Sequence, residues 1–201
     1  MRRHQLTGFI LAGGKSSRMG ADKAGLSLNG RTLLDHALAA MRPVCEQVFI
    51  IGPRAQYADF GPGHEDIFPG CGPLSGVHTA LTHSRTQMNL VLAVDTPFLT
   101  AELLSYLADR AESSSYTVVA PMVAGQIQPL CAAYSRSFLP IAEAALNAGK
   151  YKLAALFPRE KTLMIPEEDL RRFAFAPEMF ENLNTPEDLE HARQRISGRK
   201  P

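Results

Sequence analysis

The chain has 201 residues, of which 45% are hydrophobic and 20% are charged, and its formal net charge is +1 at pH 7. This length and composition are typical of a globular protein, exclude a disordered one, and predict a single domain over residues 1–201. The small net charge gives no electrostatic basis for binding nucleic acid or an anionic membrane surface, so neither is expected as a partner.

The first predicted element is a strand at Thr7–Ala12 that runs into adjacent glycines, Gly13 and Gly14. An uninterrupted apolar run is typical of a buried parallel strand, and glycines at its end let the backbone approach a ligand closely. Three cationic side chains follow: Lys15, Arg18 and Lys23. Backbone N–H groups in such a turn can surround phosphate oxygens while nearby cations balance their charge. The segment is therefore a candidate phosphate-binding loop.

Two common phosphate loops do not match this segment. A Walker A motif ending in Gly14, Lys15 and Ser16 needs its first glycine at position 9, which is Phe9. A dinucleotide-binding fingerprint needs spaced glycines, whereas those at the end of this strand are adjacent. The segment instead resembles the nucleotidyltransferase signature L-A-[GA]-G-x-[SG]-x-R-[ML]-G-x-x-K. The residues that match it in register are Leu11, Ala12, Gly13, Gly14, Ser16, Arg18, Met19, Gly20 and Lys23.

Apolar runs alternate with helical patterns along the rest of the chain. Further strands are predicted at Gln47–Ile51, Leu90–Val94, Thr117–Pro121, Leu130–Tyr134 and Thr162–Ile165. Helices are predicted at Thr32–Met41, Leu74–His83, Glu102–Arg110 and Leu139–Ala148, with a last helix after an N-cap at Thr185. Because strands that alternate with helices indicate βαβ units, the predicted fold class is α/β with a mostly parallel sheet.

Asp95 ends the apolar run of one predicted strand. Ligands of an open parallel sheet bind beyond the carboxyl ends of its strands, so Asp95 and the glycine loop can share a crevice. A carboxylate in such a crevice suits Mg²⁺, which is usually held by one or two carboxylates together with substrate phosphates. The alternative is that Asp95 caps the short turn that enters Phe98–Leu107.

A second acidic residue, Asp66, precedes a segment rich in glycine and proline that reaches Gly76. This composition disfavours regular structure until a helix begins near Leu74. The segment could wrap a substrate, with Asp66 accepting hydrogen bonds from a base or a ribose, or it could be an ordinary surface loop.

The three cysteines, Cys45, Cys71 and Cys131, are widely separated and show no metal-binding spacing. Reduced thiols in a cytoplasmic protein are the expected state. The apolar run before Gly13 is too short for a secretory signal or a membrane-spanning helix, so neither is expected.

Together with the glycine loop, four further segments resemble the molybdenum cofactor guanylyltransferase (MobA) family. They are GPLSG at 72–76, VDTPFL at 94–99, QPLCAAY at 128–134 and NLNTPEDL at 182–189. The resemblance covers about residues 6–192 and implies a Rossmann-like three-layer sandwich of the nucleotidyltransferase type. The letters LAGG, where related cytidylyltransferases commonly have LAAG, favour guanine over cytosine. One departure is at Ile51, Gly52 and Pro53, where the family often has an asparagine.

The resemblance also implies roles for individual residues. Those expected to bind GTP are Leu11, Ala12, Gly13, Gly14, Lys23, Asp66 and Asp95, with Lys23 on the phosphates and Asp66 on the guanosine portion. Asp95 would in addition bind Mg²⁺, the expected cofactor. The catalytic residues implied are Lys23, Asp95 and Arg18. Asn182 and Asn184 match positions that handle the pterin substrate.

The implied reaction transfers GMP from GTP to the terminal phosphate of molybdopterin and releases pyrophosphate. Proteins that deliver the molybdenum cofactor, or molybdoenzymes that accept it, are the partners that the family implies. The alternatives are a CTP-dependent molybdopterin cytidylyltransferase, a sugar-phosphate nucleotidyltransferase, and a non-catalytic protein that binds a nucleotide or the cofactor.

Overall fold

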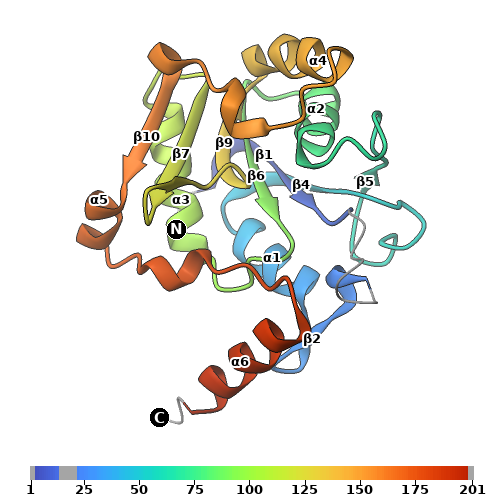
Figure 1. Ribbon diagram of the computed structural model, residues 1–201, viewed down its shortest axis with the longest axis vertical. Coiled ribbons are helices and arrows are strands. Elements are labelled where there is room, and N and C mark those ends of the chain that lie inside the picture. The colour runs from blue at the N-terminus through green and yellow to red at the C-terminus, as the bar shows by residue number, and fades with distance from the viewer. Residues whose placement is uncertain (1–2, 14–21, 199–201) are drawn as a thin grey trace.

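The computed structural model describes residues 3–13 and 22–198, which are arranged around a large central sheet (Figure 1). The strand order is β10-β7-β9-β6-β1-β4-β5, and β8 pairs with β7 at the side of this path. The strands are β1 (His4–Leu11), β4 (Cys45–Ile51), β5 (Gly63–His64), β6 (Met88–Ala93), β7 (Val118–Val123), β8 (Gln126–Ile127), β9 (Cys131–Ser135) and β10 (Thr162–Pro166). β1 is parallel to both β4 and β6, and β10 is parallel to β7. β9 lies antiparallel between β6 and β7. Because the three pairings of β1 and β10 are parallel, the sheet is mostly parallel, as predicted.

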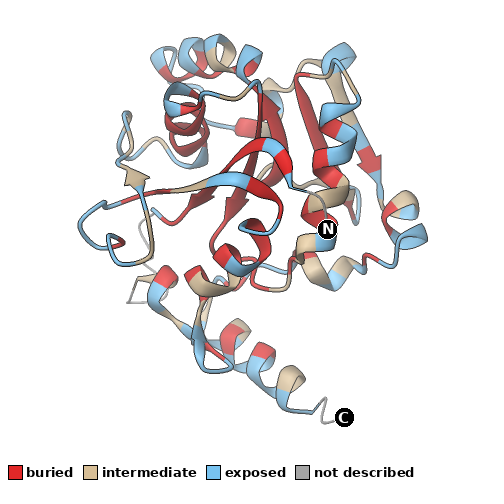
Figure 2. Cartoon of the chain, turned by 180° about the vertical axis from the view of Figure 1, so that it is seen from behind, coloured by how far each residue is buried: buried red, intermediate tan, exposed pale blue. Residues whose placement is uncertain are grey.

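Helices cover both faces of the sheet. One face packs against α1 (Leu33–Met41) and α3 (Ala101–Glu112), and the other packs against α2 (Pro73–His83) and α4 (Leu139–Asn147). β1 contributes to both sides because its side chains alternate: Leu6 and Ile10 belong to the first hydrophobic cluster, and Phe9 and Leu11 to the second. The strands between the helices are largely buried (Figure 2). The predicted three-layer α/β fold is thereby confirmed.

Two helices begin with reciprocal capping contacts that are encoded locally. At α1, Thr32 Oγ1 accepts from the backbone N–H of Asp35, and the Asp35 side chain accepts from Thr32 N. Thr185 and Asp188 form the same capping box at α6 (Pro186–Ser197), which confirms the predicted N-cap. The shorter helices are η1 (Lys23–Gly25), η2 (Arg136–Phe138), η3 (Leu153–Leu156), η4 (Arg159–Lys161), α5 (Glu167–Arg172) and η5 (Pro177–Phe180).

A small hairpin of β2 (Ser27–Leu28) and β3 (Arg31–Thr32) was not predicted. Its turn places Asn29 and Gly30 at φ values of 51° and 76°, which are the positive values of a tight hairpin turn. The C-terminal helix α6 lies beside this hairpin (Figure 1), and Arg193 donates to the Ser27 carbonyl at 2.8 Å. Across 3–13 and 22–198, no helix is both long and apolar enough to span a membrane.

Candidate active site

A cavity of about 530 Å³ lies at the carboxyl ends of β1, β4 and β6. Six separate segments of the chain supply its walls. The lining residues are Leu11, Ala12, Gly13, Lys23, Ile51, Asp66, Gly70, Gly72, Pro73, Gly76, Ala93, Val94, Asp95 and Leu130. The cavity brings together the end of the first strand, Lys23, Asp66 and Asp95, as expected for strands that end at the same edge of a parallel sheet. The Asp66–Gly76 segment also lines the cavity, which agrees with the hypothesis that this segment faces a substrate.

The end of β1 is held very close to the end of β4. The N–H groups of Ala12 and Gly13 both donate to the Ile51 carbonyl, at 2.9 and 3.1 Å. A Cβ on Gly13 would lie 3.3 Å from Gly52 Cα, and a Cβ on Gly52 would lie 3.0 Å from Gly13 N. Gly52 also has a φ of +154°, which an L side chain rarely adopts. Gly52 belongs to the Ile51–Pro53 stretch where the family often has an asparagine, and its backbone N–H donates to the His64 carbonyl at 3.0 Å.

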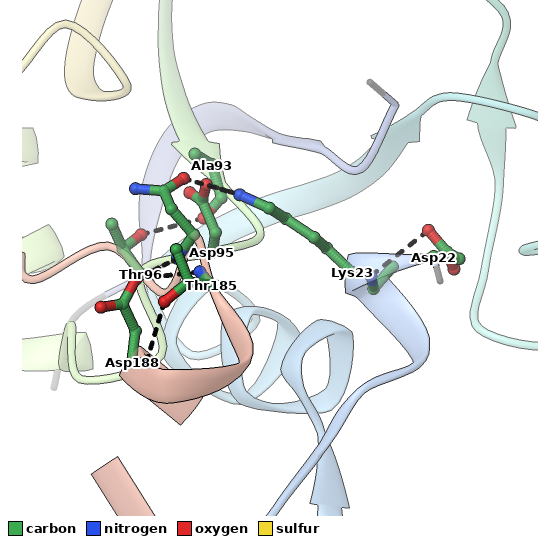
Figure 3. Close-up of polar contacts among 9 residues, drawn as sticks. Asp22, Lys23, Ala93, Asp95, Thr96, Thr185 and Asp188 are labelled. Carbon is green, nitrogen blue, oxygen red and sulfur yellow. Dashed lines mark hydrogen bonds and ion pairs between the residues drawn. The ribbon is translucent and has the colours of Figure 1, made fainter. Parts of the chain in front are cut away.

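Lys23 spans the cavity wall from η1 to the end of β6 (Figure 3). Its ammonium lies 2.8 Å from Asp95 Oδ2 and 2.7 Å from Asn184 Oδ1. The side chains of Lys23 and Asp95 are only 18% and 19% exposed, so little water screens the ion pair. Asp22 precedes Lys23 and caps η1, because its side chain accepts from the Ala24 N–H.

The segment before α6 reaches this ion pair through a backbone contact. Leu183 is buried, and its N–H donates to the Asp95 carbonyl at 2.8 Å. This contact brings the neighbouring Asn184 to Lys23, although the two residues are 161 positions apart. Asn182 is exposed, and within the described chain its side chain forms no hydrogen bond. The structure therefore brings Asn184, one of the two predicted pterin-site asparagines, to the ion pair, and shows no such contact for Asn182 within the described chain.

Asp66 is held by a side chain of the following helix. Ser75, which is buried in the first turns of α2, donates from Oγ to Asp66 Oδ1 at 3.1 Å. Burial raises the pKa of Asp66 above its ordinary value, and the Ser75 hydrogen bond lowers it and so opposes part of that effect. The second oxygen, Oδ2, would lie 3.4 Å from a Cβ on Gly13, so the carboxylate faces the glycine end of β1.

Tyr57 contacts residues of this site, although no pattern in the sequence predicts it. Its side chain is 5% exposed, and its hydroxyl lies 2.9 Å from Asp22 Oδ1 and 3.1 Å from the Ala12 carbonyl. Burial, together with the Asp22 carboxylate, raises the pKa of Tyr57 well above its usual value, so the hydroxyl remains a donor. No sequence motif marks this tyrosine.

The metal-binding prediction rests on Asp95. Within residues 3–13 and 22–198, no three His, Cys, Asp or Glu side chains gather closely enough to form a metal site by themselves. Asp95 nevertheless fits an ion that is shared with substrate phosphates, because its carboxylate is in the cavity wall and Lys23 contacts it through Oδ2.

Two other predicted residues, Gly14 and Arg18, lie outside the described residues.

Comparisons with known proteins identify relatives over most of the chain. Residues 8–163 match the family model of the MobA-like NTP transferase domain. A probable molybdenum cofactor guanylyltransferase of Carboxydothermus hydrogenoformans is 37% identical over 186 residues, covering 92% of this chain and 93% of the relative. A protein of the same description from Pelotomaculum thermopropionicum is 36% identical over 192 residues, with 94% and 92% covered.

Solved structures show the same architecture. The crystal structure of molybdopterin-guanine dinucleotide biosynthesis protein A from Archaeoglobus fulgidus is similar with a TM-score of 0.83 and 27% identity, covering 96% of this chain and all of the other. A 2-C-methyl-D-erythritol 4-phosphate cytidylyltransferase from Thermus thermophilus has a TM-score of 0.67 at 18% identity, covering 94% and 98%, and so shares the fold.

Proposed function

Because this chain belongs to the MobA-like NTP transferase family, we propose that it transfers GMP from GTP to the terminal phosphate of molybdopterin. The observation that carries the proposal is the ion pair of Lys23 and Asp95 in the wall of the cavity, with Asn184 bound to the same ammonium. The cation suits the triphosphate, the carboxylate suits a metal ion, and the asparagine suits a polar acceptor such as a pterin. One cluster thus offers groups for every component of the reaction.

The chemistry needs no general base. A phosphate monoester has a second pKa of about 6, so the terminal phosphate of molybdopterin is already an anionic nucleophile at neutral pH. One of its oxygens attacks the α-phosphorus of GTP. The new P–O bond forms as the bond to the pyrophosphate oxygen breaks, and both electrons of the broken bond leave with pyrophosphate. Catalysis therefore depends on positioning and on neutralising charge.

Lys23 stabilises the negative charge that develops on the leaving pyrophosphate. To reach the phosphates, its ammonium exchanges Asp95 and Asn184 for phosphate oxygens, a short movement for a flexible side chain that already lines the cavity. Asp95 is then free to hold Mg²⁺, which when bound neutralises phosphate charge. Asn184 becomes free to contact the pterin substrate together with Asn182. Arg18 is the second cation that we assign to the phosphates.

The guanine base is recognised by Asp66, away from the Lys23–Asp95 ion pair. Guanine presents N–H donors on its Watson–Crick edge, and the Asp66 carboxylate is an acceptor that Ser75 keeps in place at 3.1 Å. Leu11, Ala12 and Gly13 form the floor on which the nucleotide rests, and Gly14 is assigned to nucleotide binding by the family signature alone. The buried, unbridged Cys45 and Cys131 suit a cytoplasmic protein. Proteins that deliver or collect the molybdenum cofactor are the partners we expect.

The test is transfer of label from α-labelled GTP to molybdopterin in the presence of Mg²⁺, with pyrophosphate measured alongside. Equal yields of labelled dinucleotide and pyrophosphate are expected, with CTP, ATP and UTP much poorer donors. Lys23→Met should lower the rate on the order of 100-fold, and Lys161→Met, the same change at an exposed position on η4, should not. A preference for CTP would instead indicate a cytidylyltransferase. Release of inorganic phosphate from GTP without an acceptor would refute nucleotidyl transfer.

A further inference from the structure

We propose that Tyr57 is a positioning residue that fixes the backbone from which Lys23 reaches the phosphates. Its hydroxyl contacts one acceptor before residues 14–21 and one after them. These are the Ala12 carbonyl at 3.1 Å and Asp22 Oδ1 at 2.9 Å. One buried side chain thus sets the separation between the end of β1 and the start of η1. This inference rests on the role proposed above for Lys23.

The linkage from Tyr57 to Lys23 passes through Asp22. Asp22 Oδ1 receives the tyrosine hydroxyl and also the Ala24 N–H, the contact that caps η1. Lys23 is the first residue of η1, so the backbone that carries it is held directly by this carboxylate. Asp22 Oδ1 and the Ala12 carbonyl oxygen can both only accept, and the tyrosine has a single hydroxyl proton, so the hydroxyl connects them by sharing that proton between the two acceptors.

At the other acceptor, Ala12, the backbone is held by a hydrogen bond and close packing. The Ala12 N–H is bonded to the Ile51 carbonyl, and the neighbouring Gly13 lies against Gly52. The Tyr57 ring is part of the same packing, since a Cβ on Gly52 would lie 3.0 Å from its Cε2 atom. Tyr57 therefore connects η1 to a closely packed part of the cavity floor, and small errors in the position of a catalytic cation cost large factors in rate.

The first test replaces the hydroxyl and keeps the ring. Tyr57→Phe should lower kcat for guanylyl transfer by about tenfold, with a smaller change in KM for GTP. Asp22→Ala should give a similar loss, Asp22→Asn should retain most of the activity because its side-chain oxygen still accepts, and the double variant Tyr57→Phe/Asp22→Ala should be no worse than either alone. Thermal unfolding of each variant shows whether the fold is kept.

Comparison in two backgrounds separates positioning from a general structural role. In a Lys23→Met background, Tyr57→Phe should change the residual rate by less than twofold, because the cation it positions is gone. An equal loss in both backgrounds, or full activity in Tyr57→Phe, would overturn the proposal.

A binding measurement gives an answer even if the protein transfers no GMP. Calorimetric titration with GTP and with guanosine should show that Tyr57→Phe weakens GTP binding several-fold and leaves guanosine binding unchanged, because only GTP offers phosphates to Lys23. Parallel loss of both affinities would refute the positioning role. Normal GTP binding by the wild-type protein without transfer would refute the proposed function alone.

Discussion

The ammonium of Lys23 forms an ion pair with Asp95, 2.8 Å from Oδ2, in the wall of the candidate site. The two groups proposed to act on the phosphates therefore neutralise each other before a nucleotide arrives. Neither charge is left buried and unpaired in this arrangement, which would be costly in a weakly screened environment. A nucleotide with its metal ion can replace both halves of the pair at once, since phosphates attract Lys23 and the cation attracts Asp95.

The response of the protein to Mg²⁺ and GTP should depend on Asp95. A ligand at 100 times its dissociation constant stabilises a protein by about 2.7 kcal/mol, and a tenfold loss of affinity reduces this to about 1.4 kcal/mol. We expect Asp95→Asn to lose at least tenfold in affinity, so that Mg²⁺ and GTP stabilise it in thermal unfolding by about 1.4 kcal/mol or less. Glu46→Gln removes one carboxylate at the opposite end of β4 and should respond like the wild type. Equal stabilisation of both variants would rule out Asp95 as the metal ligand.

The glycine at the end of β1 should influence the choice of base. A Cβ on Gly13 would lie 3.3 Å from Gly52 Cα and 3.4 Å from Asp66 Oδ2, so Gly13→Ala narrows the cavity beside the acceptor proposed for guanine. We expect about a tenfold lower affinity for GTP, with CTP affected less, in equilibrium titrations. Gly198→Ala, at an ordinary contact near the end of α6, is the matched control. If GTP and CTP lose affinity equally, Gly13 serves the fold and not selectivity.

Replacement of Asp66 should separate stability from binding. Because burial raises its pKa in the folded state, the ionised carboxylate destabilises the nucleotide-free protein above that pKa, and the penalty disappears as pH falls toward the ordinary value of 3.8. Asp66→Asn should therefore raise Tm at pH 7, with the difference shrinking as the pH is lowered to 4, while GTP affinity falls. Asp109→Asn, an exposed carboxylate on α3, should change neither quantity appreciably. A lower Tm for Asp66→Asn at pH 7 would show that the carboxylate stabilises the fold instead.

The thiols should differ in reactivity. Burial raises the pKa of Cys45 and of Cys131 to about 12, and both side chains are inaccessible. Cys71 is only partly buried and lies in the Asp66–Gly76 segment that lines the cavity. Titration of the native protein with an aromatic disulfide should therefore modify Cys71 rapidly and the other two only after unfolding. GTP should slow the fast phase, and a Cys71→Ser variant should lack it.

Local signals in the sequence were sufficient for the longer strands and helices. The apolar run of β1, the capping box of Thr185 with Asp188, and the proline that begins α6 act within a few residues, so their structures follow from the chain itself. The hairpin at Asn29 and Gly30 was missed although that dipeptide is a strong turn signal, because its strands are only two residues long.

The sequence by itself determined the α/β class, the glycine end of β1, and the acidic residue that follows β6, because strand and turn preferences are local. The tertiary structure alone decided which distant side chains meet. Asn184 reaches Lys23 because the Leu183 N–H is bonded to Asp95, and Tyr57 reaches Asp22 because β1 and β4 are adjacent. Contacts of this kind depend on which distant segments pack together. No local sequence pattern at Asn184 or Tyr57 indicates that packing.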